Sequence, residues 1–203
     1  MGDRAVEQPP PLEAALLLLS RLTRGRIRIA RERRYVLRDL LGPPLVAPEV
    51  VVAFDFAPEA RVDEYLRLGE DTPEKLSRRL QRGDRLFVGE VESELRFFGW
   101  LHLHEHPGSS PTVRTALIYK CFTAPEWRGR GLYTAGLCSA RQWLAKAGVA
   151  AAVIDVHERN LPSIRGIERS GFRAFGRFWL ARICRRRIAV LMPRYLHEYG
   201  PSL

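Results

Sequence analysis

The feature that most constrains the fold is a nearly uninterrupted apolar run at residues 150–157, which follows a long helical pattern ended by Gly148. A strand with so few polar residues is typical of one buried on both faces of a sheet. Around it, turn and helix-stop signals divide residues 49–203 into strand and helix patterns. This order predicts an α/β domain with a mixed sheet.

The expected strands span residues 50–56, 86–91, 95–106, 115–123, 150–157, 172–183 and 187–191. The expected helices span residues 58–68, 73–83, 131–146 and 162–170. The second of these helices has the clearest start, because Thr72 can cap it and Pro73 suits its first position.

Residues 1–48 are predicted to form a basic N-terminal extension, which a proline-rich linker separates from the main domain at residues 49–203. The extension is expected to hold a loose tail, a short helix at residues 13–22 and a strand at residues 35–40. Residues 21–34 contain seven arginines. Their periodicity leaves two structures open, an exposed strand or a basic amphipathic segment.

The formal net charge of +10 lies at the two ends, because residues 1–48 and 172–203 carry surpluses of four and six positive charges. Basic ends suit nucleic acid, acidic lipid headgroups or a phosphate-bearing ligand, and equally an ordinary solvated surface. No basic motif of a known nucleic-acid module is visible, so a nucleic-acid partner is not expected. Peripheral contact of the N-terminal helix with a membrane surface stays open.

The 3 cysteines form no CxxC pair, which argues against a disulfide scaffold and a zinc knuckle. The apolar stretch at residues 14–19 is too short to cross a bilayer, and acidic residues precede it where a signal peptide is basic. We therefore expect a cytoplasmic protein, with monomer and homodimer both left open.

The stretch Pro125–Tyr133 joins an apolar strand directly to the longest predicted helix. Gly129 and Gly131 permit positive φ and a close approach of a ligand to the backbone. Amides at a helix start favour an anion, and Arg128 and Arg130 add positive charge there. The stretch is predicted to hold a phosphate, although its spacing is neither that of a nucleotide P-loop nor that of a dinucleotide fold. An unliganded glycine turn is the alternative.

Further along, Asn160 precedes a short predicted helix and the pair Gly171–Phe172. Together with Arg128 and Gly131, this pattern resembles the two signatures of the GNAT superfamily of acyl-coenzyme A-dependent N-acyltransferases. The resemblance extends over residues 49–192.

The resemblance implies a mixed, mostly antiparallel central sheet flanked by helices, in which strands 115–123 and 150–157 splay apart. It also implies acetyl-CoA as cosubstrate and no metal. The pyrophosphate is expected on the amides of Arg128, Gly129, Arg130, Gly131 and Leu132. The pantetheine arm is expected to bond the backbone near Phe122 and Thr123, and Asn160 is expected to assist.

Three departures from the family pattern leave the acid–base residues open. Tyr133 stands where the first signature has Gly or Ala, and Ile167 replaces a tyrosine that often donates a proton to the thiolate. No carboxylate lies within residues 115–119, where a general base is common. Tyr119 and Tyr133 are candidate proton relays through water, and Asp155 or His157 is a candidate base. For each of these residues an ordinary structural role is the alternative.

His102, His104 and His106 alternate along one predicted strand, which places their side chains on one face. His102 and His104 are expected to lie beside the acceptor cleft and contact the substrate. A metal site built from these imidazoles is the less favoured alternative.

The sequence thus predicts transfer of an acetyl group from acetyl-CoA to an amine of a small-molecule acceptor by direct attack. An acidic acceptor is expected if the basic ends flank the groove. Two other classes stay open: a catalytically inert GNAT-fold module that binds coenzyme A or regulates, and a basic protein that binds nucleic acid or a membrane surface.

Overall fold

The computed structural model describes residues 27–44, 53–56, 61–68, 71–106, 113–183 and 186–191. The chain divides into two compact units, one formed by residues 34–175 and one by residues 1–33 with 176–202. The predicted tail, the helix at 13–22 and the end of the linker lie outside the described residues. Within the described residues, no helix is long and apolar enough to span a bilayer.

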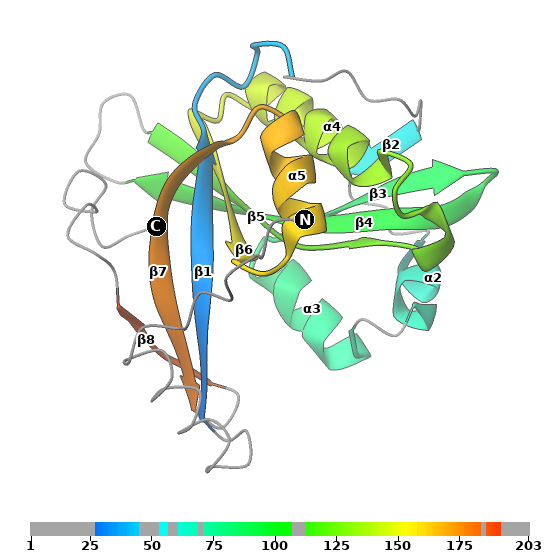
Figure 1. Ribbon diagram of the computed structural model, residues 1–203. Helices are drawn as coiled ribbons and strands as arrows, with labels where there is room; N and C mark the ends of the chain where they lie inside the picture. Colours follow the sequence, from blue (N-terminus) through cyan, green and yellow to red (C-terminus); the bar gives the residue numbers. More distant parts are fainter. Residues whose placement is uncertain are drawn as a thin grey trace, which may run out of the picture. The chain divides into compact units, whose positions relative to one another are not determined.

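An eight-stranded sheet runs through the described residues (Figure 1). Its order is β2 (Ala53–Phe56), β3 (Arg85–Val91), β4 (Glu94–His106), β5 (Val113–Thr123), β6 (Ala151–His157), β1 (Ile27–Leu37), β7 (Arg173–Ile183) and β8 (Arg186–Leu191). The strands β2 to β5 pair antiparallel, and β5 pairs parallel with β6. The predicted mixed, mostly antiparallel sheet is therefore confirmed.

Two pairs of helices cover the two faces of this sheet (Figure 1). They are α2 (Val62–Arg67) with α3 (Pro73–Gln81) on one face, and α4 (Leu132–Lys146) with α5 (Leu161–Arg169) on the other. The start of α3 is as predicted, because Pro73 opens the helix and the Thr72 side chain accepts a hydrogen bond from the Lys75 amide at 3.4 Å.

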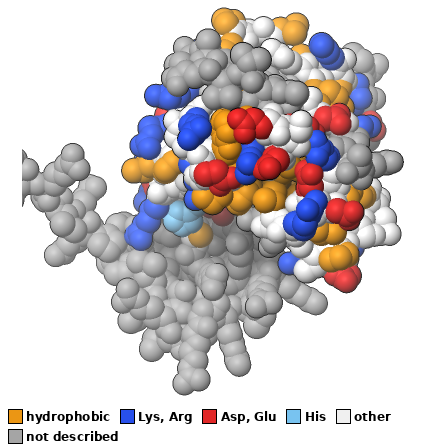
Figure 2. Space-filling view, turned by 90° about the vertical axis from the view of Figure 1, so that its right-hand side faces the viewer, with side chains coloured by type: hydrophobic (Ala, Val, Ile, Leu, Met, Phe, Trp, Pro, Cys, Tyr) orange, Lys and Arg blue, Asp and Glu red, His pale blue; other side chains and the backbone are white. Residues whose placement is uncertain are grey.

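Both acidic and basic side chains lie on the described part of the face drawn in Figure 2. The ion pairs of the larger unit account for such mixing. Arg61 pairs with Glu64 and Glu90, and Arg96 pairs with Glu94 and Glu126. This mixing agrees with the neutral charge balance of the middle of the sequence.

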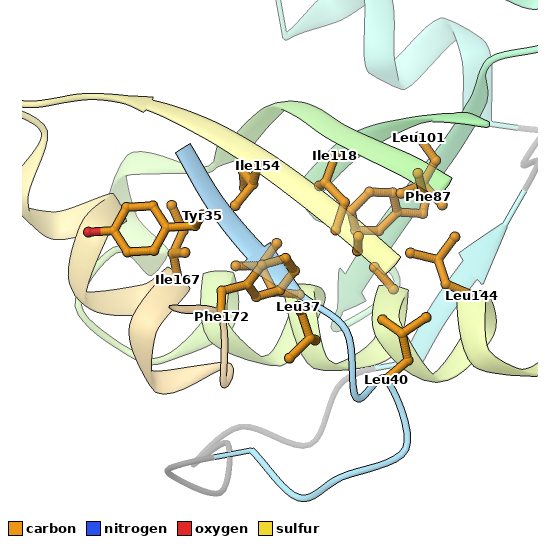
Figure 3. Close-up of a cluster of buried hydrophobic side chains, with 14 of the residues drawn as sticks. Tyr35, Leu37, Leu40, Phe87, Leu101, Ile118, Leu144, Ile154, Ile167 and Phe172 are labelled. Carbon is orange, nitrogen blue, oxygen red and sulfur yellow. The ribbon is translucent and has the colours of Figure 1, made fainter. Parts of the chain in front are cut away.

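The larger apolar cluster packs between the sheet and the α4–α5 layer (Figure 3). Tyr35 and Leu37 of β1 pack there beside Ile167 and Phe172. The Tyr35 hydroxyl also donates a 2.9 Å hydrogen bond to Glu168. The end of the strand that the sequence places in the N-terminal extension thus contributes to the core of the larger unit.

The smaller unit is described through three strand segments. They are residues 27–33 of β1, residues 176–183 of β7, and β8 (Arg186–Leu191), which pairs antiparallel with β7. The two C-terminal strands expected from the sequence are present and antiparallel, within one residue of the expected bounds.

A bidentate ion pair joins β1 to β6 within the larger unit. Arg34 donates to both carboxylate oxygens of Asp155 at 2.8 and 2.9 Å, and the two side chains are only 10% and 11% exposed. Removing one partner of such a pair leaves a nearly buried charge without its counter-ion.

We predict that Asp155→Ala lowers the free energy of unfolding by about 3 kcal/mol, because it strands the Arg34 guanidinium. The double variant Arg34→Met/Asp155→Leu should recover most of that loss, since it removes both charges. Urea unfolding followed by circular dichroism measures both. Arg61→Ala, which breaks a more exposed ion-pair group, should cost clearly less than Asp155→Ala. Strictly additive losses from the two single substitutions at positions 34 and 155 would contradict the prediction.

Candidate active site

The parallel pairing of β5 with β6 stops partway along both strands. It runs from Thr115↔Ala151 to Ile118↔Ile154, whereas β5 continues to Thr123 and β6 to His157. Beyond Ile118, the edge of β5 that faced β6 has no β6 partner in this pairing. Backbone groups on such an edge need other hydrogen-bond partners.

A β-bulge follows directly where the strands part. The register between β4 and β5 shifts between Phe98 and Trp100, and Lys120 has φ of 50°. Positive φ is costly for a residue with a side chain. The Lys120 ammonium lies 2.9 Å from the buried carboxylate of Asp71, an attraction that helps to hold the bulge.

The segment between β5 and α4 presents main-chain amides at the start of that helix. Gly129 and Gly131 have φ of 78° and 79°, in the left-handed region that the sequence predicted for them. The Arg128 amide donates to the Pro125 carbonyl at 3.2 Å, so it is already engaged. The amides of residues 129–134 donate to no protein acceptor in the described part of the chain. Of the amides that the sequence predicts to bind pyrophosphate, that of Arg128 is thus occupied, and those from Gly129 to Leu132 remain available.

A cavity of about 740 Å³ lies beside these amides. Eight residues predicted from the sequence line it: Phe122, Thr123, Arg128, Gly129, Gly131, Leu132, Tyr133 and Asn160. Arg130 is not among the lining residues, and its guanidinium lies 4.7 Å from the centre of the Trp127 ring. The cavity thus runs from the parted end of β5 to the starts of α4 and α5.

Helix α5 contributes polar groups that the sequence reasoning missed. Arg165 and Arg169 line the cavity one helical turn apart, and Ser163 lies nearer the helix start. Their spacing of four residues is the signal that could have identified them. Asn160 caps α5, with its side-chain oxygen accepting from the Ser163 amide at 3.3 Å.

Tyr133 fills space that a glycine leaves open on α5. A Cβ at Gly166 would lie 2.5 Å from the Tyr133 ring, so this ring position depends on Gly166. Burial raises the pKa of Tyr133 well above its usual value, and the phenol stays protonated near neutral pH. Ile167, next to Gly166, is fully buried in the apolar core.

Two of the predicted catalytic residues lie away from the lining of this cavity. Asp155 is held by Arg34 in the ion pair described above. His157 is exposed at the end of β6, where its Nδ1 accepts a 3.1 Å hydrogen bond from the Arg159 amide.

Tyr119 belongs to a hydrogen-bonded cluster on the sheet face covered by α2 and α3. Its hydroxyl donates to Asp84, and Asp84 also receives hydrogen bonds from Arg82. Burial, followed by the hydrogen bond to Asp84, raises the pKa of Tyr119 to about 12. This tyrosine is therefore unsuited to accept a proton near neutral pH.

His102 joins the same cluster, with its Nδ1 2.5 Å from Asp84 Oδ1. The His102 and His104 rings meet edge to face, 4.4 Å apart, as expected for side chains on one face of a strand. The His106 side chain lies outside the described residues. Among the residues that the structure describes, no group of three His, Cys, Asp or Glu side chains is arranged to hold a metal ion.

Comparison with known proteins agrees with the resemblance noted in the sequence. The sequence model of the Acetyltransferase (GNAT) family matches residues 53–172. A mycothiol acetyltransferase from Acidothermus cellulolyticus is 30% identical over 190 residues, which represent 81% of this chain and 57% of that protein. This chain therefore spans little more than half the length of that relative.

Solved structures share the fold. An acetyltransferase from the GNAT family of Colwellia psychrerythraea superposes with a TM-score of 0.55 at 13% identity, over 82% of this chain and 56% of that one. An aminoglycoside acetyltransferase from an uncultured soil metagenomic sample gives 0.51 at 15% identity, over 59% of this chain and 86% of that one.

The family match covers the parted strands, the free amides at the start of α4 and the cavity between them. On sequence and architecture together, the chain belongs to the Acetyltransferase (GNAT) family.

Proposed function

We propose that the chain transfers an acetyl group from acetyl-CoA to a primary amine of a small molecule, by direct attack of the amine on the thioester. The observation that carries this proposal is the row of unengaged amides from Gly129 to Thr134 at the edge of the cavity. Such amides, at the positive end of the 15-residue helix α4, stabilise a bound pyrophosphate.

The pantetheine arm would extend along the edge of β5 beyond Ile118. There it can add to the sheet as a further strand, with hydrogen bonds to the backbone of Phe122 and Thr123. Burial of its methylene and methyl groups against Phe122 and Leu132 adds apolar stabilisation.

Arg165 and Arg169 supply positive charge at the far side of the same cavity. Acetyl-CoA carries a ribose phosphate in addition to its pyrophosphate. We propose that these guanidiniums contact this additional phosphate, for which their planar donor sets are well suited.

The thiolate that leaves needs a proton, and Tyr133 is the proposed donor. It lines the cavity, and its raised pKa keeps its hydroxyl protonated. Tyr133 would thus act in place of the tyrosine that Ile167 replaces. Cys121 lines the cavity close to Tyr133, which places the phenol beside the end of β5 where the strands part.

The names of the relatives favour a small-molecule acceptor. One is a mycothiol acetyltransferase and one an aminoglycoside acetyltransferase. The predicted acidic character of the acceptor rested on the arginine-rich ends, which lie mostly outside the described residues. The proposed acceptor is therefore a small-molecule amine, with no charge assigned to it.

We predict that Gly129→Glu weakens acetyl-CoA binding by about 100-fold or more, since it places a carboxylate against the bound diphosphate. Gly83→Glu is the matched control. Both glycines have positive φ, 78° and 82°, and neither has an atom within 4 Å of a built Cβ, so the backbone strain is comparable. Gly83 follows α3, away from the cavity lining. Titration calorimetry of both variants measures the effect, and equal affinities for the two would reject the amide site.

We also predict acetyl-CoA-dependent release of free thiol when the wild-type chain is supplied with a panel of small primary amines. The Tyr133→Phe variant should turn over more slowly and retain its acetyl-CoA affinity, because it loses only a proton donor. A thiol assay and product mass spectrometry measure the reaction. Tight acetyl-CoA binding with no turnover on any amine would instead support the inert, coenzyme-binding alternative.

A further inference from the structure

We propose that His102 is the general base that deprotonates the acceptor amine, and that Asp84 is the residue that positions it. This inference rests on the proposed function. The sequence reasoning expected His102 only as a substrate contact and did not identify Asp84. The assignment comes from a cluster of side chains that three separate elements bring together on the α2–α3 face of the sheet.

Asp84 is the centre of the cluster. It precedes β3, directly after the turn that Gly83 makes with φ of 82° at the end of α3. Its side chain has no exposed surface, yet it accepts hydrogen bonds from His102, Tyr119 and Arg82. Burial alone would raise the pKa of Asp84, but these three donors outweigh it and hold the pKa below the usual range. Asp84 is therefore an anion that only accepts hydrogen bonds.

An anionic partner decides which ring nitrogen of His102 carries the proton. Because Asp84 Oδ1 lies 2.5 Å from Nδ1, that nitrogen must be the donor. In the neutral ring, Nε2 then holds the free lone pair, as a base requires. Nε2 has no partner among the described residues, and the side chain is 21% exposed.

The cluster lies where the sheet opens. Tyr119 is the first residue of β5 past its last pairing with β6, and it is two residues from Cys121 in the cavity lining. His102 pairs with Leu117 on β5, so it is diagonal to Tyr119 on the same face. An acceptor held on the α2–α3 face would thus reach the thioester carbonyl at the point where the ladder between β5 and β6 ends.

The other candidate bases are engaged or unsuitable. Asp155 is paired with Arg34, and His157 is exposed at the end of β6. Tyr119 is itself a donor to Asp84. His102 is the member of the predicted set that combines an anionic positioning partner, a free ring nitrogen and partial exposure.

His102 Nε2 takes one proton from the ammonium form of the acceptor, and the nitrogen lone pair attacks the thioester carbonyl carbon. The C–N bond forms and the C–S bond breaks; the leaving thiolate takes a proton from Tyr133, and the second proton of the nitrogen restores the Tyr133 phenol. The imidazolium returns its proton to water, so one proton is released for each amide formed.

The groups facing His102 are Asp84 before β3, Arg82 at the end of α3, His104 on its own strand and Tyr119 on β5. Arg79 lies above the Tyr119 ring at 5.1 Å from its centre. Because charged groups surround the ring, the test compares pH profiles and not single rates.

The decisive variant is His102→Asn, whose side-chain amide can still donate to Asp84 but cannot act as a base. We expect kcat/KM, measured with an amine of the panel that the wild type acetylates, to fall by about 10²–10⁴-fold at neutral pH. The loss should shrink to within about 10-fold at a pH where the free amine is already deprotonated, because a base is then no longer needed. Loss by one constant factor at every pH would overturn the proposal.

Asp84→Asn provides the second measurement. It should lower kcat strongly and change KM less. It should also shift the acid limb, which is the fall in activity on the acidic side of the pH profile, since the ring loses its anionic partner. His104→Gln removes the neighbouring imidazole and should keep the acid limb. An acid limb lost in His104→Gln and kept in His102→Asn would also overturn the proposal.

Acetyl-CoA affinity separates this inference from the proposed function. Both variants should bind acetyl-CoA as the wild type does, which also shows that they are folded. A wild-type chain that releases no thiol with any amine defeats the proposed function itself. Wild-type turnover with a normal acid limb in His102→Asn defeats only the role of His102.

Discussion

The early end of the ladder between β5 and β6 is the constraint on which the rest of the site depends. The two strands separate after Ile118 and Ile154, and Lys120, two residues beyond Ile118 on β5, adopts positive φ. Separation frees a strand edge inside a covered sheet, where backbone groups seek partners. The same separation lets the starts of α4 and α5 approach one cavity, because each helix follows one of the two parted strands.

The two faces of the sheet carry different chemistry beside this opening. The α4–α5 face offers free amides, two arginines and a protonated tyrosine, a set suited to phosphates and a leaving thiolate. The α2–α3 face holds the buried carboxylates of Asp71 and Asp84. Burying such charges is costly, and each is offset by several donors. The carboxylate of Asp84 in turn fixes the side chains of Tyr119 and His102, which donate to it, beside the place where the strands part.

A large side chain on α4, Tyr133, packs against a glycine on α5, Gly166. Tyr133 occupies a position where the family has a small residue, and Gly166 leaves room for its ring. Ile167, in the place of a frequent tyrosine, instead completes the apolar core beneath the sheet. Tyr133 therefore lines the cavity from a different helix than the one that carries Ile167.

The sequence by itself determined the strands and helices of residues 53–191 to within a few residues, and the glycine loop at the start of α4. These features follow from periodicity, capping and turn preferences, which act over short windows. The tertiary structure alone decided that β1 lies between β6 and β7, that Arg165 and Arg169 face the cavity, and that Asp155 serves an ion pair. It alone revealed Asp84, which lies 18 residues from His102 and 35 from Tyr119. Those contacts depend on the register of three strands, and register is set by how the whole core packs, which no local pattern encodes.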